Sequence, residues 1–397
     1  MAELSQTIHE ISAGMQREMT GIRRYLHQHP ELSNEEKETA AFICRKLDEY
    51  DIPYKSGIAG TGVVGLIRGE QGDGPCILLR ADMDALPVKE ENKTDYVSCV
   101  EGVMHACGHD VHMTCLLGAA RILQMMKNTF RGSVKVLFQP SEETYPGGAV
   151  RMIGEGVLTD PKVDMALGAH VFPELKAGQA GFHPGPFMAS TDEIHLTVKG
   201  KGGHAASPHL NVDPVLIAAH ILIALQEIVS RNANPLMPTV LSFGRISGEG
   251  RTNIIPDEVR IDGTVRTFNE EWRKEIHRRV ETIATSIAAG MNGSCDVRIA
   301  HGYPFVNNNE ALTDKLRHWA PEYLGEAQVA DLDRIMTAED FSYFAEAVPS
   351  CFYRLGIRNE EKGFTANLHS STFDVDESAL ETGAGLMAWF ASRLLNE

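Results

Sequence analysis

The densest group of potential metal ligands in the sequence is the segment MHACGHDVHM at residues 104–113. Cys107 and His109 stand two residues apart at the mouth of a predicted helix, so both side chains can face one cation. Thiolate and imidazole are the ligands that zinc and its neighbours prefer, and a helix N-terminus favours the thiolate form. The motif therefore indicates a metal site. Such short matches are common by chance. One alternative is that His109 and His112 lie on a solvent-exposed face, and another is that Cys107 is a core residue.

A pair of adjacent carboxylates, Glu142 and Glu143, follows an apolar run in the segment SVKVLFQPSEE at 133–143. In a surface turn such a pair would be no more than solvated charge. At the end of a buried strand it suggests that one carboxylate binds metal while the other accepts a proton from an activated water. Neighbouring strand residues point in opposite directions, so the backbone must turn here, and Pro140 favours such a turn.

Two further histidines, His170 and His369, lie in the segments GAHV and LHSS. Each histidine taken alone is more often structural. Together with Cys107, His109 and Glu143 they make five potential ligands, and most of them lie just past a predicted strand. Five ligands exceed what one zinc ion needs, so the sequence predicts a two-metal site.

The elements that must hold these residues alternate between helix and strand. Apolar residues at three- and four-residue spacing predict helices at 5–29, 34–50 and 111–127. Unbroken apolar runs predict buried strands within CILLRADMDALP (76–87), SVKVLFQPSEE (133–143) and VDMALGAHV (163–171), and the first two run into acidic residues. This alternation predicts an α/β domain with a mostly parallel central sheet. Ligands of such sheets collect beyond the carboxyl ends of the strands, which is where the acidic residues and His170 fall.

A second pattern begins near residue 187. Segments that read as strand, helix, strand, strand, helix and strand follow one another between 193 and 301, an order that fits a ferredoxin-like α+β sandwich. The chain then returns to a strand at 351–357 and a helix at 376–395. We therefore expect a discontinuous catalytic domain, 1–186 and 302–397, interrupted by an inserted domain at 187–301.

The bulk composition narrows the class of protein. A length of 397 residues favours two domains. The formal net charge of −17, from 54 acidic and 37 basic residues, argues against binding to nucleic acid or to anionic membranes. Seven cysteines at irregular spacing do not form a disulfide framework. The N-terminal segment lacks an apolar signal core and no apolar run approaches a bilayer span, so we expect a cytoplasmic protein.

In the segments that carry the potential metal ligands, the sequence resembles the aminoacylase/carboxypeptidase superfamily of dinuclear metallopeptidases. It is most similar to the amidohydrolase branch, which contains hippurate hydrolases, N-acyl-amino-acid amidohydrolases and plant auxin-conjugate hydrolases. Nine stretches run in family order and cover nearly the whole chain: RRYLHQHPELSNEE (23–36), RADMDALPV (80–88), MHACGHDVHM (104–113), QPSEE (139–143), GAHV (168–171), GKGGHAASPH (200–209), TNIIPD (252–257), AEDFSYF (338–344) and LHSSTFD (368–374).

The resemblance implies a role for each potential ligand. It implies two divalent metal ions, zinc or else manganese, cobalt or nickel, with Cys107 as the bridging thiolate. The remaining ligands would be His109, Glu143, His170 and His369. Glu142 would be the general base. Asp82 stands where the superfamily often has a ligand histidine, and with His109 present the resemblance makes Asp82 and Asp84 orienting residues.

The resemblance also gives the inserted domain a function. It implies a lid that dimerises, so that the protein is a homodimer. His204 is similar to the residue that reaches into the partner subunit's site and stabilises the oxyanion. Asn253 and Arg266 match positions that hold the substrate's carboxylate, for which the two-pronged guanidinium is suited.

Two departures from the family pattern leave the substrate open. Ser370-Ser371 stands where Ser/Asn-Pro is common after the C-terminal histidine, and Met336-Thr337-Ala338 precedes Glu339 where Gly or Ser is more usual. The ligand set itself is intact.

The sequence thus predicts metal-dependent hydrolysis of the amide bond of N-acyl amino acids (N-acetyl, N-benzoyl or similar), which releases a carboxylic acid and a free amino acid. One alternative is a dipeptidase or carboxypeptidase of the same superfamily, since the same site cleaves peptide bonds. Another is a metal-binding scaffold without catalysis. The presence of Glu142 argues against the scaffold, because a structural site needs no base.

Overall fold

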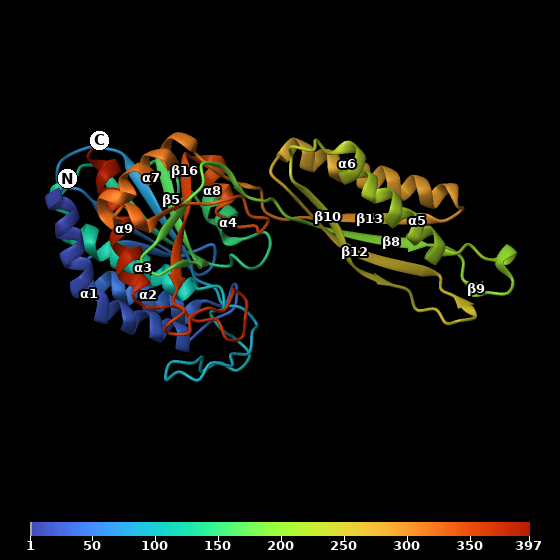
Figure 1. The fold of residues 1–397 in the computed structure, drawn as a ribbon, viewed down its shortest axis with the longest axis horizontal. Helices are drawn as coiled ribbons and strands as arrows, with labels where there is room; N and C mark the ends of the chain where they lie inside the picture. Colours follow the sequence, from blue (N-terminus) through green and yellow to red (C-terminus); the bar gives the residue numbers. More distant parts are fainter. Residues whose placement is uncertain (1) are drawn as a thin grey trace. The chain divides into compact units, whose positions relative to one another are not determined.

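The computed structural model describes residues 2–397, which divide into two units (Figure 1). The first unit comprises the chain up to Gly185, Asn307–Asp333 and Asp340–Glu397, and the inserted unit comprises Pro186–Val306 and Arg334–Glu339. The insertion expected at 187–301 falls within Pro186–Val306. The expected insertion did not include Arg334–Glu339, a second segment of the inserted unit that is too short to carry a periodic signal.

The first unit is built on an eight-stranded sheet in the order β1-β2-β4-β3-β5-β16-β6-β15. The central strands β4, β3, β5 and β16 run parallel to one another, while the pairs β1–β2, β2–β4 and β16–β6 are antiparallel. This mostly parallel α/β sheet confirms the predicted fold class. The strands are β1 Tyr54–Ile58, β2 Gly62–Arg68, β3 Cys76–Asp82, β4 Ser133–Gln139, β5 Met165–Lys176, β6 Ala180–Phe182, β15 Val329–Asp331 and β16 Ser350–Arg358.

Burial explains why the central strands form without polar alternation. Every residue of β3 and β4 is buried, as expected of strands covered on both faces. The predicted end of β5 at Val171 is wrong, because pairing with β16 continues beyond it and Phe172 lies opposite Gly356. His170 therefore lies inside β5 and not after its end. Since Arg80 on β3 is opposite Gly168, His170 is nevertheless level with the last residue of β3.

Helices cover the sheet on both sides (Figure 1). On one side α1 packs on α3 and α9, and α3 and α9 pack on the sheet; on the other, α4 and α8 contact each other, β4 and β16. The helices are α1 Ala2–Gln28, α2 Lys37–Glu49, α3 His109–Met125, α4 Gly148–Gly154, α7 Glu310–Leu324, α8 Ser342–Ala347 and α9 Ala379–Leu395, with short turns η1 Lys127–Thr129 and η4 Glu326–Gln328.

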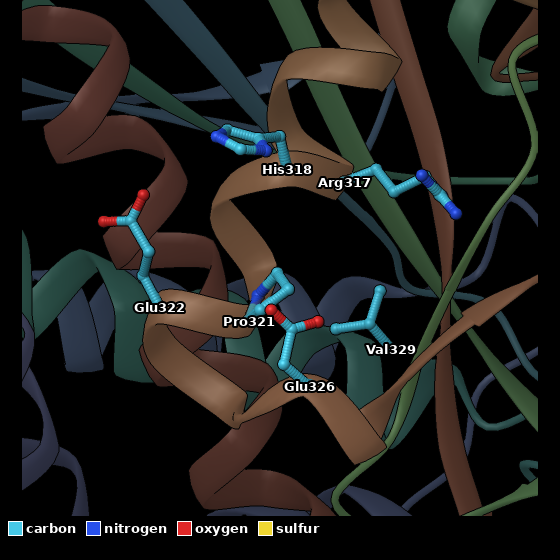
Figure 2. Close-up of a pocket in the computed structure, with 6 residues that line it drawn as sticks. All are labelled: Arg317, His318, Pro321, Glu322, Glu326 and Val329. Atoms are coloured by element: carbon cyan, nitrogen blue, oxygen red, sulfur yellow. The ribbon is translucent and has the colours of Figure 1, made fainter.

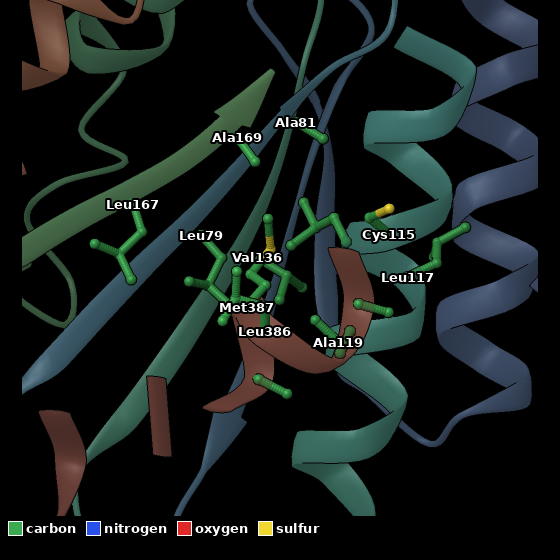
Figure 3. Close-up of a cluster of buried hydrophobic side chains, with 14 of the residues drawn as sticks. Leu79, Ala81, Cys115, Leu117, Ala119, Val136, Leu167, Ala169, Leu386 and Met387 are labelled. Atoms are coloured by element: carbon green, nitrogen blue, oxygen red, sulfur yellow. The ribbon is translucent and has the colours of Figure 1, made fainter. Parts of the chain in front are cut away.

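The core of the first unit joins α3 and α9 to the sheet. Figure 3 shows side chains of the strands, among them Leu79, Val136 and Leu167, beside Leu117 of α3 and Leu386 of α9, and all five are buried. Burial of one such side chain stabilises the fold by about 1.5–3 kcal/mol. This packing fixes the first turn of α3 relative to the strand ends.

The inserted unit has the predicted order of elements. Strands β8 (Asp192–Lys199), β10 (Thr239–Ser247), β12 (Glu258–Thr267) and β13 (Ser294–His301) form a sheet in the order β10-β12-β8-β13, in which every neighbour is antiparallel. Helices α5 (Pro214–Glu227) and α6 (Glu270–Gly290) pack on it over a separate apolar core. Strands β9 (Gly203–His204) and β11 (Ile254–Ile255) pair as a two-stranded ribbon, and the short turn η2 (Pro208–Leu210) follows β9. Strands β7 (Gly185–Met188) and β14 (Val306–Asn308) pair with each other where the chain passes between the units.

Helix α5 corrects one expectation from the sequence. It continues through a π-helical turn (Ile228–Asn232), and by length and composition the segment Pro214–Asn232 is apolar enough to cross a membrane, contrary to the expectation that no apolar run approached that length. About a third of the segment is buried. A single helix of this kind is weak support for a membrane span, because helices that pack within a protein pass the same test.

A buried ionic network fastens α1 to the first turn of α3. The Arg23 side chain, fully buried, donates from Nε to Asp110 Oδ2 and from an Nη to Asp374 Oδ1, both at 2.9 Å. His27 contacts the same Asp110 oxygen at 2.8 Å, and its other ring nitrogen lies 3.2 Å from Glu90. Burial alone would raise the pKa of Asp110, but Arg23 and His27 outweigh it and lower the pKa far below its usual range.

We expect Arg23→Met to lower the free energy of unfolding by about 3–5 kcal/mol, because it leaves two buried carboxylates without their cation. Arg24→Met is the matched control. That neighbouring side chain is 38% exposed and pairs with Glu377, so its loss should cost about 1 kcal/mol or less. Chemical denaturation of both variants measures the difference, and equal losses would show that the buried network does not hold α3.

Candidate metal centre

The loop before α3 brings Cys107 and His109 to the edge of the sheet. Gly108 between them has φ +82°, and a Cβ added there would lie 2.5 Å from the side chain of Val171 on β5. Only glycine permits both this backbone conformation and this close approach. His109 and His112 are both buried, which rules out the alternative that they lie on a solvent-exposed face, and Cys107 is buried as well.

The five residues predicted as ligands lie in the first unit and their donor atoms converge. Cys107 Sγ is 3.5 Å from His170 Nε2 and 3.3 Å from His369 Nε2. Glu143 Oε1 is 3.6 Å from His369 Nε2 and 4.0 Å from His109 Nε2. Donor atoms lie within 4.8 Å of one another in three overlapping sets, Cys107/His109/His170, Cys107/Glu143/His369 and His109/Glu142/Glu143. Cys107 and His109 each belong to two of these sets. Of the two, the Cys107 thiolate is suited to lie between two cations, because its sulfur has several lone pairs and an imidazole nitrogen has one.

Unsatisfied buried atoms show that this cluster fits a cation. Across residues 2–397, neither ring nitrogen of His109 has a hydrogen-bond partner, nor does Glu143 Oε1. Native proteins rarely leave buried polar atoms unpaired unless an ion or a water satisfies them. Thiol, imidazole and carboxylate are together a donor set for zinc or a neighbouring transition metal.

Hydrogen bonds to β5 fix the orientation and tautomer of two histidines. His170 Nδ1 donates to its neighbour's carbonyl, Val171 O, at 2.8 Å, which leaves the Nε2 lone pair directed at Cys107. The Val171 amide donates to His112 Nε2 at 2.9 Å, so His112 carries its proton on Nδ1 and donates it to Asp82 Oδ1 at 2.6 Å. His112 thus has no lone pair left for a metal, and it serves to orient Asp82.

The protonation of the cluster depends on its many acidic groups. Burial raises the pKa of the Cys107 thiol well above its ordinary value, and Glu143, Glu142 and Asp82 raise it further. Burial alone would lower the pKa of His109, but Asp82, Asp84 and Glu143 raise it to about 10. A bound cation would reverse both effects, because it favours the thiolate and the neutral imidazole.

A backbone turn after β4 lets both glutamates face one centre. Such a turn was expected, because adjacent residues of a strand would point in opposite directions. Ser141 has φ +55°, and the two amides that follow it donate to one carboxylate: Glu142 N to Asp84 Oδ1 at 3.0 Å and Glu143 N to Asp84 Oδ2 at 2.9 Å. Asp84 Oδ1 also lies 3.5 Å from His109 Nδ1. Asp84 therefore positions Glu142 and Glu143 through their backbone amides, and it lies beside the ring of His109.

Further buried partners were not predicted from the sequence. Arg80 on β3 donates to Gln139 Oε1 at 2.9 Å, to Asp82 Oδ2 at 2.5 Å and to Asp340 Oδ1 at 2.8 Å. The Gln139 amide donates to both Asp340 oxygens, and Asp340 Oδ2 also accepts the Ala149 amide. A signal was available, because a charged residue within a buried strand requires a partner. This network ties the ends of β3 and β4 to the segment that follows Glu339.

The remaining predicted site residues belong to the inserted unit. His204 and Asn253 are exposed neighbours, since Ala205 N donates to Asn253 O at 3.1 Å beside the β9–β11 ribbon. Arg266 is half-buried on β12, opposite Val240 of β10. Ala206 N donates to His204 Nδ1 at 3.0 Å, so the neutral ring carries its proton on Nε2.

A surface pocket of about 410 Å³ in the first unit lies beside α7 (Figure 2). Two of its charged residues are already paired, Arg317 with Asp331 and Glu322 with Arg393. Its lining contains none of the predicted site residues, so it does not compete with the Cys107 cluster. The lining residues are Arg317, His318, Pro321, Glu322, Glu326 and Val329.

Comparisons with known proteins agree with this chemistry. The model of "Peptidase family M20/M25/M40" matches residues 78–393. An N-acetyl-L-cysteine deacetylase of Bacillus subtilis is 40% identical over 96% of this chain and 89% of its own length. An IAA-amino acid hydrolase of Arabidopsis thaliana (ILR1-like 4) is 38% identical over 96% of this chain and 86% of its own length. The crystal structure of the Bacillus subtilis YXEP protein, described as a dinuclear metal binding peptidase, is 33% identical with a TM-score of 0.83, covering 96% of this chain and 99% of that one.

Proposed function

Because this chain belongs to peptidase family M20/M25/M40, we propose that it hydrolyses the amide bond of N-acyl amino acids with two bound metal ions. The observation that carries the proposal is the buried Cys107 cluster with two adjacent carboxylates, in which His109 and Glu143 have unsatisfied atoms. The names of the relatives support the substrate class, since one is a deacetylase of an N-acetyl amino acid and another acts on amino-acid conjugates. The products are a carboxylic acid and a free amino acid.

The proposed ligands are the five converging side chains Cys107, His109, Glu143, His170 and His369, with Cys107 shared by both ions. Two divalent cations there, zinc or else manganese, cobalt or nickel, would polarise the amide carbonyl and lower the pKa of a water molecule. The protein's own contribution is to hold these donors fixed. His170 is held by Val171 O, and His369, at φ +63°, donates its amide to Ala106 O at 2.8 Å.

Glu142 is the proposed general base. It is 6% exposed, its amide is held by Asp84, and its carboxylate lies within 4.8 Å of His109 and Glu143 donor atoms. It takes one proton from the attacking water as the new C–O bond forms. It then passes that proton to the amide nitrogen as the C–N bond breaks, so the amine leaves as a neutral group.

Residues of the inserted unit are proposed to bind the substrate. With its Nδ1 occupied by the Ala206 amide, His204 keeps an Nε2–H donor on an exposed residue, which suits it to stabilise a developing oxyanion. Arg266 can bind a carboxylate through two parallel hydrogen bonds, and Asn253, beside His204, would donate a further one. A free carboxylate on the substrate distinguishes an N-acyl amino acid from a simple amide.

The test is the release of free amino acid from N-acetyl, N-benzoyl and longer N-acyl amino acids and from dipeptides. We expect cleavage of N-acyl amino acids that a chelator abolishes and that added zinc or manganese restores. Cleavage of dipeptides alone would establish the peptidase alternative. No cleavage of any substrate by folded, metal-loaded protein would leave a metal-binding scaffold.

Adjacent isosteric variants provide the internal control for this test. Glu142→Gln should bind metal like the wild type and lose about 10²–10⁴-fold in kcat, because only the proton acceptor is removed. Glu143→Gln should lose metal affinity as well, because it removes a ligand. Near-normal turnover by Glu142→Gln would refute the assignment of the base.

We propose that the active protein is a homodimer formed through the inserted unit, with His204 completing the partner's site. The exposed face of α5 supports this proposal, because Val215, Leu216 and Ile223 are 46%, 52% and 73% exposed. Apolar side chains aligned on one helix face are typical of a protein–protein interface.

If this face forms the dimer, Ile223→Glu should shift the mass measured by light scattering to that of one 43.6 kDa chain, because it buries an unpaired charge at the interface. The activity should fall with it. Met125→Glu is the control, since Met125 is 59% exposed at the end of α3 in the first unit and should leave the mass unchanged. A wild-type protein that is an active monomer would contradict both the dimer and the role of His204 in the partner's site.

A further inference from the structure

The turn that aims the glutamate pair depends on a sparsely populated backbone conformation. Ser141 has φ +55° and is fully buried. Residues other than glycine adopt this left-handed region rarely, and they remain there only when surrounding contacts hold them. Proline precedes Ser141, so the strand cannot simply continue through this point. What holds Ser141 therefore decides where Glu142 and Glu143 point.

The contact that holds Ser141 comes from the distant residue Glu36. The Ser141 amide donates to Glu36 Oε1 at 2.8 Å, and the Ser141 hydroxyl lies 3.4 Å from the same oxygen. On its other side the Ser141 carbonyl accepts the Gly148 amide at 3.0 Å. With Asp84 binding the next two amides, two carboxylates from separate segments hold three consecutive backbone N–H groups.

The position of Glu36 beside α2 is not explained by capping of that helix. It is the residue before α2, yet its side chain does not cap that helix. The first amides of α2 are capped instead by Glu31, which accepts from Glu38 N at 3.2 Å and Thr39 N at 2.8 Å. Glu36 is fully buried, and its second oxygen accepts the Thr61 hydroxyl at 2.8 Å. Among residues 2–397 it has no ion-pair partner, and its carboxylate accepts hydrogen bonds from Ser141, from Thr61 and from its own backbone amide.

We infer that Glu36 is a positioning residue, which holds Ser141 in the left-handed conformation so that Glu142 and Glu143 both face the Cys107 cluster. Asp84 alone cannot do this, because it binds only the amides after the turn. Without Glu36 the buried Ser141 amide would lose its acceptor, and the backbone could relax to negative φ. Such a change would rotate the two following residues together. This inference rests on the proposed metal centre and deepens it.

The test compares Glu36→Ala with Glu36→Gln as Co²⁺-loaded proteins. Glu36→Ala should bind Co²⁺ about 10–100-fold more weakly, as when other partners of metal ligands are removed, and its Co²⁺ absorption spectrum should change because Glu143 moves. With an N-acyl amino acid that the wild type hydrolyses, kcat should fall by a similar factor while KM changes little. Glu36→Gln should restore most of these properties, because its amide oxygen still accepts from Ser141 and its NH₂ can donate to Thr61.

A second change separates the turn from general stability. Ser141→Gly introduced into Glu36→Ala should recover part of the Co²⁺ affinity, since glycine adopts positive φ without a tether. A structural role of Glu36 elsewhere would not respond to this change. The Co²⁺ readouts need no substrate, so they still test Glu36 if N-acyl amino acids are not hydrolysed.

Two results would overturn the inference. One is a Glu36→Ala protein with the wild-type Co²⁺ affinity and spectrum. The other is a Glu36→Gln protein as impaired as Glu36→Ala, which would mean that the charge of Glu36 matters and its hydrogen bond does not. A wild-type protein that binds no Co²⁺ would remove the metal centre and this inference with it.

Discussion

The burial of acidic groups at one edge of the central sheet is the constraint on which the first unit depends. Asp82, Asp84 and Glu142 are all buried, and Cys107 and Glu143 lie beside them. Burying one ionised carboxylate without compensation is costly. The Arg80 guanidinium compensates the charge of Asp82. Asp84 accepts hydrogen bonds from the backbone amides of Glu142 and Glu143, which stabilise its charge and orient both glutamates. Within the chain, histidines are the cationic neighbours of Glu143, with His369 Nε2 at 3.6 Å and His109 Nε2 at 4.0 Å. A metal ion would replace that imidazolium charge and stabilise the Cys107 thiolate as well.

The fold supplies this edge through adjacent parallel strands, because β3 and β4 end there and β5 passes beside their ends. β3, β4 and β5 are adjacent and parallel, so a carboxylate after β3, a pair after β4 and a histidine on β5 meet without long side chains. α3 begins at the same edge, and its first turn is fastened from behind by Arg23 and His27 through Asp110. Rigid elements on several sides are what a metal centre needs to keep its donors in place.

The sequence was sufficient to predict the α/β class, because unbroken apolar runs and helical periodicity are strong signals. It also singled out Cys107, His109, Glu143, His170 and His369, whose donor atoms converge in the structure, while their role as ligands stays a prediction. Strand ends were less predictable. The apolar signal of β5 ends near Val171, yet its pairing with β16 extends the strand to Lys176.

The supporting contacts could not be predicted, because they join residues far apart in the chain. No local pattern connects Glu36 to Ser141 across 105 positions, or Arg80 to Asp340 across 260. The left-handed φ of Ser141 was also hidden, since serine carries no conformational signal of the kind that glycine does. The expectation that no apolar run approaches a bilayer span failed at Pro214–Asn232, where α5 and the irregular turn Ile228–Asn232 form one continuous apolar segment.

The central claim is that one buried cluster holds two metal ions that share Cys107. Anomalous X-ray diffraction from crystals of the zinc-loaded protein, recorded on both sides of the zinc absorption edge, measures this directly. We predict two anomalous peaks in the first unit of each chain, both within about 2.3 Å of Cys107 Sγ. One peak should lie beside a His170 nitrogen and the other beside a His369 nitrogen. A single peak, or two peaks that do not both contact the Cys107 sulfur, would contradict it.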